Sequence, residues 1–327
     1  MQNLFTPLSV KNLTLKNRII MPPMATAKAN GDGTMSKEIL EYYHEKTKDE
    51  YLSMVIVEHS FISEQGRANK GQLSVSKDAH IEGLKSLADL LRKNNTISCL
   101  QINHAGIYAR PLDSFMLPIG PSPSPTKTVK VMTREAIGLL IKEFAEAARR
   151  TKEAGFDAVE IHSAHGYLLN QFYSPLCNKR TDSYGGSLHN RMRLHIEILE
   201  AVRAAVGEEY PIFLRLGASD YKEGGVTLTE SIQAAKIFQE KGLDLLDVSG
   251  GFAGYTHPED LQQGYFKELT SALKAHLSIP VILTGGITDL QAADQLVREE
   301  QTDLVGIGRA IYKDSNFLEN ALKELEA

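Results

Sequence analysis

The sequence predicts an α/β protein that forms a single (β/α)8 barrel, with an N-terminal β-hairpin closing the barrel floor. Short apolar runs rich in Val, Ile and Leu recur along the 327 residues, and helical patterns separate them. The runs are continuous rather than alternating, which is typical of parallel strands covered on both sides. No fixed-period repeat and no linker divides the chain. Residues 1–327 are therefore expected to form one domain.

Eight apolar runs are the expected barrel strands. They lie at Arg18–Pro22, Leu52–Val57, Ile97–Ile102, Asp157–Ile161, Ile212–Leu216, Leu245–Val248, Val281–Leu283 and Leu304–Ile307. Before the first run, the segment Leu8–Leu15 predicts a hairpin that turns at Lys11 and Asn12. Side chains just past the carboxyl end of a barrel strand face the active site, so the residues that follow these runs are the candidates for chemistry.

Helix signals between the runs support the alternation. Thr133 can cap a helix that stops at Gly155, Ser187 can begin one that continues through Val206, and Thr227 with Glu230 has the form of a capping box on a helix that ends at Gly242. Two gaps between strands, residues 104–132 and 162–187, are longer than one helix requires. Long loops in compact domains are usually functional or disordered, and both would lie on the catalytic face.

Composition limits the classes of partner. The chain has 42% hydrophobic residues, 24% charged residues and a net charge of −5, so neither nucleic acid nor an anionic membrane is expected to bind it. The two cysteines, Cys99 and Cys177, do not make a disulfide framework and favour a reducing compartment. The N-terminus lacks a signal-peptide layout, and no apolar run has membrane-spanning length. A cytoplasmic protein is the expectation.

Two imidazoles and a phenol follow the fourth strand run. His162, His165 and Tyr167 can together bind an oxygen atom and deliver a proton. A pair of histidines three residues apart could also hold a metal. However, the spacing differs from the helical pair of zinc proteases, and no third ligand stands out. The preferred interpretation is a metal-free acid–base site.

Glycines follow the last two strand runs. Gly285 and Gly286 come after the seventh run, and Gly308 with Arg309 comes after the eighth. Barrels often bind phosphate at these two loops, where glycines let backbone N–H groups approach the anion and an arginine can add a charge-assisted bond. The glycines could instead serve only as turn residues, and the phosphate could belong to a substrate or to a cofactor.

Several segments spread over essentially the whole chain form a recognisable series. They are Lys16–Arg18, Met21–Met24, Gln101–Gly106, His162–Phe172, Asn178–Ser187 with Asn190 and Arg191, Leu214–Leu216 and the two glycine sites. In these segments and in their order the chain resembles the old yellow enzyme family of FMN-dependent NAD(P)H:flavin oxidoreductases and ene-reductases. Within the family it is most similar to the bacterial single-domain branch near the enoate and dienoyl-CoA reductase barrels. The resemblance implies a single FMN-binding TIM-barrel domain over residues 1–327.

The resemblance also implies residue roles and ligands. His162 and His165 would bind the substrate carbonyl oxygen, and Tyr167 would be the proton donor. Non-covalently and tightly bound FMN would contact Pro23, Met24, Ala25, Gln101, Arg215, Ser249, Gly250, Gly285, Gly286, Gly308 and Arg309. NADH or NADPH would be the reductant, and hydride would pass through flavin N5 to the activated C=C bond of an enone, an enoate or a quinone-like compound. A homo-oligomer is compatible with the resemblance.

Two other functions are compatible with the same residues. One is a barrel lyase or isomerase that acts on a phosphorylated metabolite, and the other is a flavin-binding protein without catalysis. Without the resemblance, Gln101 and Arg215 could equally be a satisfied core amide and an internal ion pair.

The chain departs from the family pattern at several positions, where the properties of relatives are not expected to apply. Ala25 stands where many relatives have Cys or Thr, so a different flavin potential is expected, and Ala27 replaces a Tyr of some relatives, so a wider pocket is expected. Gly106 is followed by Ile107 instead of the common Arg, for which Arg110 could compensate. The chain carries neither the arginine-bearing C-terminal extension nor the cysteine cluster of some relatives. No iron–sulfur cluster and no shared active site of that kind are therefore expected.

Overall fold

Eight parallel strands form a closed barrel in the computed structural model, which describes residues 2–326. In order around the barrel the strands are β3 (Ile19–Met21), β4 (Met54–Phe61), β5 (Ile97–Asn103), β8 (Ala158–Ser163), β9 (Ile212–Ser219), β10 (Leu245–Gly250), β11 (Val281–Thr284) and β12 (Leu304–Gly306). All eight predicted strand runs are found in it, so the predicted fold class is confirmed. The largest difference in bounds is in β4, which continues to Phe61 rather than ending at Val57.

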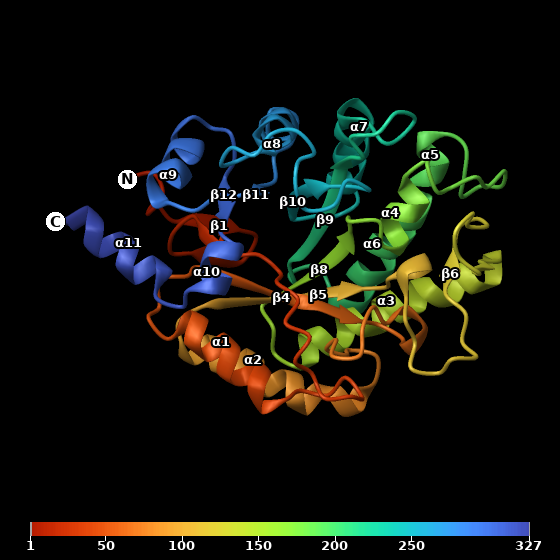
Figure 1. The fold of residues 1–327 in the computed structure, drawn as a ribbon, viewed down its shortest axis with the longest axis horizontal. Helices are drawn as coiled ribbons and strands as arrows, with labels where there is room; N and C mark the ends of the chain where they lie inside the picture. The colour runs from red at the N-terminus through yellow and green to blue at the C-terminus, as the bar shows by residue number, and fades with distance from the viewer. Residues whose placement is uncertain (1, 327) are drawn as a thin grey trace.

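Helices form an outer ring around the strands (Figure 1). They are α1 (Lys37–Thr47), α2 (Ile81–Lys93), α3 (Arg134–Glu153), α4 (Leu168–Tyr173), α5 (Leu188–Arg191), α6 (Arg193–Val206), α7 (Leu228–Glu240), α8 (Lys267–Lys274), α9 (Leu290–Arg298), α10 (Arg309–Lys313) and α11 (Phe317–Glu326). Among these helices none is long and apolar enough to cross a membrane. Short 3-10 turns are η1 (Glu64–Gly66), η2 (Asp78–His80) and η3 (Gly106–Tyr108).

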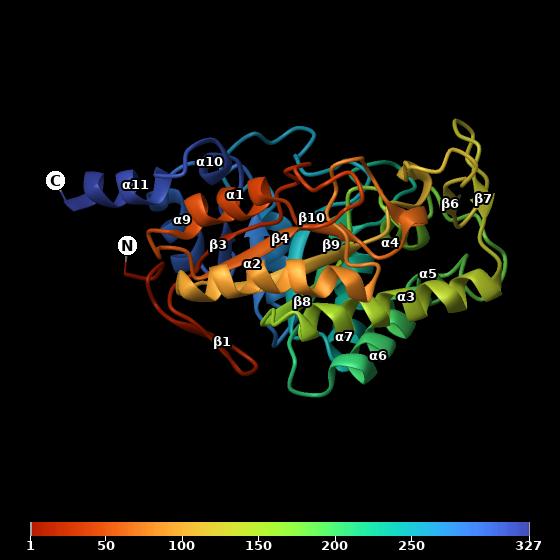
Figure 2. The same ribbon diagram turned by 90° about the horizontal axis from the view of Figure 1, so that it is seen from below.

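The N-terminal hairpin covers the floor of the barrel, as predicted. Strands β1 (Leu8–Val10) and β2 (Leu13–Leu15) pair antiparallel. Val10 and Leu15 are buried in one cluster with side chains from the barrel strands, among them Ile56 and Phe213. The hairpin and the loop that carries β6 (Ile119–Gly120) and β7 (Lys130–Val131) project at different ends of the molecule (Figure 2). The rim opposite the hairpin is therefore where long loops can build a site.

One predicted helix is divided. The segment from Ser187 to Val206 was expected to be continuous, but it consists of α5 and α6, which meet at Met192 with φ −87° and ψ −5°. Next to this break the buried guanidinium of Arg191 donates to the carbonyls of Tyr173 and Gly186. Helix α5 is thereby bonded to the last residue of α4 and to the loop before α5, whereas α6 packs along α3. A tertiary arginine contact of this kind leaves no trace in hydrophobic periodicity.

The capping box predicted for α7 is present. Thr227 Oγ1 accepts from the Glu230 backbone N–H at 3.3 Å, and Glu230 Oε2 accepts from the Thr227 backbone N–H at 3.2 Å. The two bonds satisfy donors that the first helical turn otherwise leaves free. Gly242, with φ +94°, turns the chain out of the same helix.

We expect Thr227→Ala to lower the free energy of unfolding by about 1 kcal/mol, because the cap acceptor is lost. Urea denaturation followed by circular dichroism measures the change. Thr229→Ala, an exposed position in the first turn of the same helix, is the matched control and should leave stability unchanged or slightly higher. Equal effects of the two substitutions would show that the capping bond contributes nothing.

Candidate active site

The turn after β8 brings the three predicted side chains together. His162 lies within β8, one residue before its end, and is therefore a strand residue rather than a loop residue as predicted. His165 and Gly166 both have positive φ, +58° and +73°. Left-handed backbone is costly for a histidine and is seen mostly where surrounding structure imposes it. This reversal turns His165 and Tyr167 back toward His162.

The three rings form a compact cluster. The ring centroid of His162 is 5.1 Å from that of His165 and 5.2 Å from that of Tyr167, and both contacts are edge-to-face. His165 Nε2 lies 2.7 Å from Ser249 Oγ, a hydrogen bond that joins the ends of β8 and β10. His162 Nδ1 is buried without a hydrogen-bond partner among the described residues. This nitrogen is therefore free to form a hydrogen bond with a bound molecule.

Desolvation keeps all three groups uncharged near neutral pH. Burial lowers the pKa of His162 and of His165 well below the usual range, and the nearby charge of Arg215 lowers both further. Burial raises the pKa of the Tyr167 phenol, so it stays protonated. Each neutral imidazole carries one N–H, and the phenol carries one O–H. The cluster can therefore hold an oxygen that gains negative charge and can supply a proton beside it.

Gln171 holds the loop of this cluster against the neighbouring loop after β5. Its Oε1 accepts from the Ile107 N–H at 3.1 Å, and its Nε2 donates to the carbonyls of Ala105 and Gly166. A Cβ at Gly106 would lie 2.2 Å from the same Gln171 oxygen, so glycine is required there. The side chain of Tyr167 is thus carried by a loop fixed at both ends.

A layer of buried polar side chains lies inside the barrel near the cluster. Gln101 Nε2 donates to Glu160 Oε1 at 2.7 Å, and Arg215 Nε lies 3.2 Å from Asp247 Oδ2. These pairs face each other in the strand register of β5 with β8 and of β9 with β10. Burial raises the pKa of both Glu160 and Asp247, and the charge of Arg215 opposes the rise. Glu160 Oε2 has no hydrogen-bond partner among the described residues.

The glycine loops meet on another part of the rim. A Cβ at Gly286 would lie 3.7 Å from Arg309 Nη2, and a Cβ at Gly308 would lie 3.0 Å from Met24 Sδ. Gly286 has φ +67°, and Arg309 is exposed. The loops after β3, β11 and β12 therefore converge. Pro23 is partly buried and Ala25 is exposed in the first of these loops, whereas Gly250 and Gly285 are buried.

These features fit a bound flavin nucleotide. The converging glycine loops and Arg309 suit a phosphate, and the Gln101 amide with the Arg215 guanidinium suits the polar edge of a ring system. The described residues contain no group of three His, Cys, Asp or Glu side chains arranged to hold a metal ion. His162 and His165 therefore lack the further protein ligands of a typical zinc site.

Glu58 anchors the loop that carries Ala25. Its carboxylate accepts from Thr26 Oγ1 at 2.6 Å and from the Thr26 N–H at 2.9 Å, and its own backbone N–H donates to Tyr43 Oη. Burial raises the pKa of Glu58 to about 7, although the bonds from Thr26 oppose the rise. The conformation next to Ala25 thus depends on a buried carboxyl group.

Sequence reasoning missed His59, Glu160 and Asp247. His59 lies 5.5 Å from Tyr167 between ring centroids and so belongs to the cluster. Its position was overlooked because the second strand was expected to end at Val57, and an extended β4 carries His59 to the rim. Glu160 and Asp247 lie inside strands that were interpreted as apolar, and their charge was the available signal.

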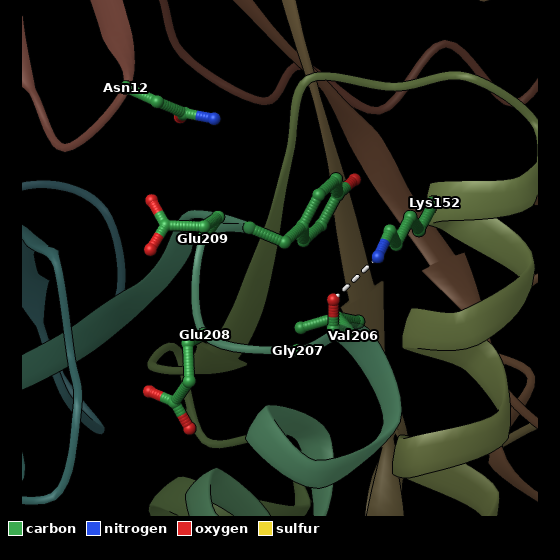
Figure 3. Close-up of a pocket in the computed structure, with 7 residues that line it drawn as sticks. Asn12, Lys152, Val206, Gly207, Glu208 and Glu209 are labelled. Atoms are coloured by element: carbon green, nitrogen blue, oxygen red, sulfur yellow. Dashed lines mark hydrogen bonds between the residues drawn. The ribbon is translucent and has the colours of Figure 1, made fainter.

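A surface pocket of about 360 Å³ lies away from this cluster (Figure 3). It is lined by Asn12, Lys152, Val206, Gly207, Glu208, Glu209 and Tyr210. Asn12 is in the turn of the floor hairpin, and Lys152 Nζ donates to the Val206 carbonyl at 2.7 Å. The pocket therefore lies at the opposite end of the barrel from the rings.

Comparison with known sequences identifies a family. The model of the NADH:flavin oxidoreductase / NADH oxidase family matches residues 3–327. The NADPH dehydrogenase of Bacillus cytotoxicus is 36% identical over 327 residues, which are 98% of this chain and 92% of that protein. The NADH oxidase of Thermoanaerobacter brockii is also 36% identical, over 329 residues and 98% of this chain, but the match spans only 50% of its length.

Solved structures show the same architecture. A 2-naphthoyl-CoA reductase in complex with 2-naphthoyl-CoA has a TM-score of 0.92 at 29% identity and covers 99% of this chain and 52% of its own. Morphinone reductase in complex with tetrahydroNAD has a TM-score of 0.84 at 26% identity, covering 98% and 90%. An old yellow enzyme homologue from Zymomonas mobilis, 24% identical, shares the fold at a TM-score of 0.84, covering 98% and 92%.

We expect Glu58→Gln to change the pH dependence of stability. The pKa of Glu58 is about 7 in the folded protein against an ordinary value of 4.5. Between these values the unfolded chain binds fewer protons than the folded chain, so the free energy of unfolding falls as pH rises. As pH rises through this range, the free energy of unfolding of the wild type should therefore fall by up to about 3 kcal/mol relative to that of Glu58→Gln.

Urea unfolding at a series of pH values measures this difference. Glu41→Gln, at an exposed position of α1, is the control and should follow the wild type. A stability difference between Glu58→Gln and the wild type that stays constant from about pH 4 to about pH 8 would contradict the raised pKa.

Proposed function

We propose, from the premise that the chain belongs to the NADH:flavin oxidoreductase / NADH oxidase family of old yellow enzymes, that it is an FMN-dependent ene-reductase. Its proposed reaction is the reduction of the activated C=C bond of an α,β-unsaturated carbonyl compound at the expense of NADH or NADPH. The observation that carries the proposal is the neutral cluster of His162, His165 and Tyr167 beside a buried arginine and a glycine-lined rim. Because the family consists of oxidoreductases, this proposal is favoured over the lyase and isomerase alternatives.

The cofactor in this proposal is non-covalently bound FMN, without an iron–sulfur cluster. When bound, FMN supplies hydride transfer between the nicotinamide and the alkene. Gln101 and Arg215 would hold the polar edge of its ring, and the loop formed by Pro23, Met24 and Ala25 would cover it. Gly285, Gly286, Gly308 and Arg309 would hold its phosphate, with Gly250 nearby. Ser249, which is hydrogen-bonded to His165, would also contact the FMN.

The histidines would bind and polarise the substrate. A carbonyl oxygen placed between His162 and His165 would accept an N–H from each ring, and these bonds strengthen as negative charge develops on the oxygen. Both rings are neutral, so each would donate its single ring N–H to the oxygen. Because Ser249 bonds His165 Nε2, the orientation of that ring is fixed before substrate arrives.

Tyr167 would deliver the proton. Its raised pKa keeps the phenol protonated at the pH of the cell, and its ring meets His162 edge-on at the site where the oxygen would bind. Protonation at the carbon next to the carbonyl would complete the reduction. The substrate is proposed to be a small enone, enoate or quinone-like molecule. The cytoplasm is the proposed setting, because Cys99 and Cys177 are both free thiols.

We expect Tyr167→Phe to lower the rate of 2-cyclohexen-1-one reduction by at least about 100-fold, because general acid catalysis contributes about 10²–10⁴-fold. NADPH consumption with the enone measures this rate. Bleaching of the flavin colour by NADPH in the absence of the enone should be unchanged, since no carbon is protonated there. Tyr312→Phe, at an exposed position of α10, is the matched control.

An enone rate in Tyr167→Phe within twofold of the wild type would remove the proton-donor role. If the wild type binds FMN and is bleached by NADPH but reduces no enone, the alternative of a flavin-binding protein without this catalysis is favoured. A protein that binds no FMN would contradict the proposal altogether.

A further inference from the structure

A third imidazole lies beside the paired histidines. The ring centroid of His59, on β4, is 5.5 Å from that of Tyr167 and 6.3 Å from that of His162. The pairing of β4 with β5 shifts register between Val57 and Ser60. A bulge of this kind re-aims side chains at the end of a strand, and here it accompanies the placement of His59 next to Tyr167 and His162. The residue as a whole is partly exposed.

The buried side chain of Gln72 binds His59 on its far edge. Gln72 Nε2 lies 2.6 Å from His59 Nδ1 and 3.1 Å from the His59 carbonyl oxygen, while Gln72 Oε1 accepts from the Ala68 N–H at 2.6 Å. The Ala68 N–H can only donate, and the His59 carbonyl can only accept. These two backbone groups fix which end of the amide is the NH2, independently of the histidine.

The fixed amide determines where His59 carries its proton. Because Gln72 Nε2 is a donor, His59 Nδ1 must be the accepting, unprotonated nitrogen. The proton of the neutral ring is then on Nε2, the nitrogen on the other side of the ring from Gln72. Burial, reinforced by the charge of Arg215, lowers the pKa of His59 to about 4, so the ring is neutral.

We infer that His59 is a specificity-determining residue: its Nε2–H, held in that tautomer by Gln72, is a third hydrogen-bond donor that selects alkenes carrying a second acceptor oxygen. This inference rests on the proposed function of the site. His162 and His165 suffice for one carbonyl oxygen, and their rings lie 5.1 Å apart. His59 lies on the side of His162 and Tyr167, so it would reach a different oxygen of the ligand.

The ligand class follows from this arrangement of donors. Three neutral imidazoles and the Tyr167 phenol form one cluster, Arg215 pairs in register with His162, and these groups offer N–H and O–H bonds. A substrate with a single carbonyl would leave the His59 donor unpaired and desolvated, which costs free energy. An unsaturated dicarbonyl, such as a cyclic imide or a quinone, satisfies it. We expect such compounds to be preferred over simple enones.

The tautomer is tested without any catalysis. Long-range 1H–15N correlation spectra of the purified protein with 15N-labelled histidine report which nitrogen of each ring carries the proton, and His59→Leu identifies the His59 signals. The expected result is the neutral Nε2–H form in the wild type and a mixed or altered tautomer in Gln72→Leu. A wild-type His59 in the Nδ1–H form, or as an imidazolium at pH 7, would overturn the inference.

Selectivity is tested by a ratio of kcat/KM values for maleimide and 2-cyclohexen-1-one, which have two carbonyl groups and one. His59→Leu should lower this ratio by about 3–10-fold, the effect of one hydrogen bond. In His59→Gln the amide Nε2 can reach the position of the lost donor, so this variant should recover part of the lost kcat/KM ratio. His189→Leu, at an exposed position of α5, should leave the ratio unchanged.

A ratio in His59→Leu within twofold of the wild type, with both activities retained, would overturn the specificity role. A wild type that reduces neither compound would contradict the proposed function instead, and the tautomer measurement would then decide whether Gln72 orients His59. The two failures are therefore distinguishable.

Discussion

The buried, positively charged guanidinium of Arg215 affects the pKa values of the other ionisable groups in the site. A buried cation is tolerated only when paired, and Asp247 supplies the pairing carboxylate from the adjacent strand. The same charge lowers the pKa of His59, His162 and His165 and opposes the burial-driven rise in the pKa of Glu160 and Asp247. Burial is the main reason that these three imidazoles are neutral at the rim, and the single cation reinforces it. Closure of the eight-stranded barrel makes this possible, because it fixes the register that sets His162 opposite Arg215.

Local backbone geometry determines the directions in which the side chains of the site point. The left-handed turn at His165 and Gly166 returns two side chains toward β8, and the register shift in β4 brings His59 to face them. Bonds made by Ser249 and Gln72 then orient two of the rings. The left-handed turn and the register shift both lie at the carboxyl end of a strand, where the loops contribute little to the stability of the barrel. The closed barrel core is stable without them, so the backbone at this rim can adopt a strained conformation.

Much of this organisation was predictable from the sequence. Continuous apolar runs predicted all eight barrel strands, the turn at Lys11 and Asn12 predicted the hairpin, and Thr227 with Glu230 predicted the capping box. All three features depend on local patterns. The cluster of His162, His165 and Tyr167 was also found, since the three lie within six residues of one another. His59 and the break at Met192 were not predicted. Both depend on tertiary partners, Gln72 for the orientation of His59 and the Arg191 contacts beside Met192, which a linear pattern does not contain.

Binding of FMN compared with riboflavin tests the central claim most directly, namely that the rim and the ring cluster together form one flavin site. Titration of the apoprotein with each ligand, followed by flavin fluorescence, gives stoichiometry and affinity. One FMN per chain should bind, and riboflavin, which lacks the phosphate, should bind at least about 10-fold more weakly, because charge-assisted bonds contribute about 1.5–3 kcal/mol each. Equal affinity for the two ligands, or no binding of either, would contradict the account.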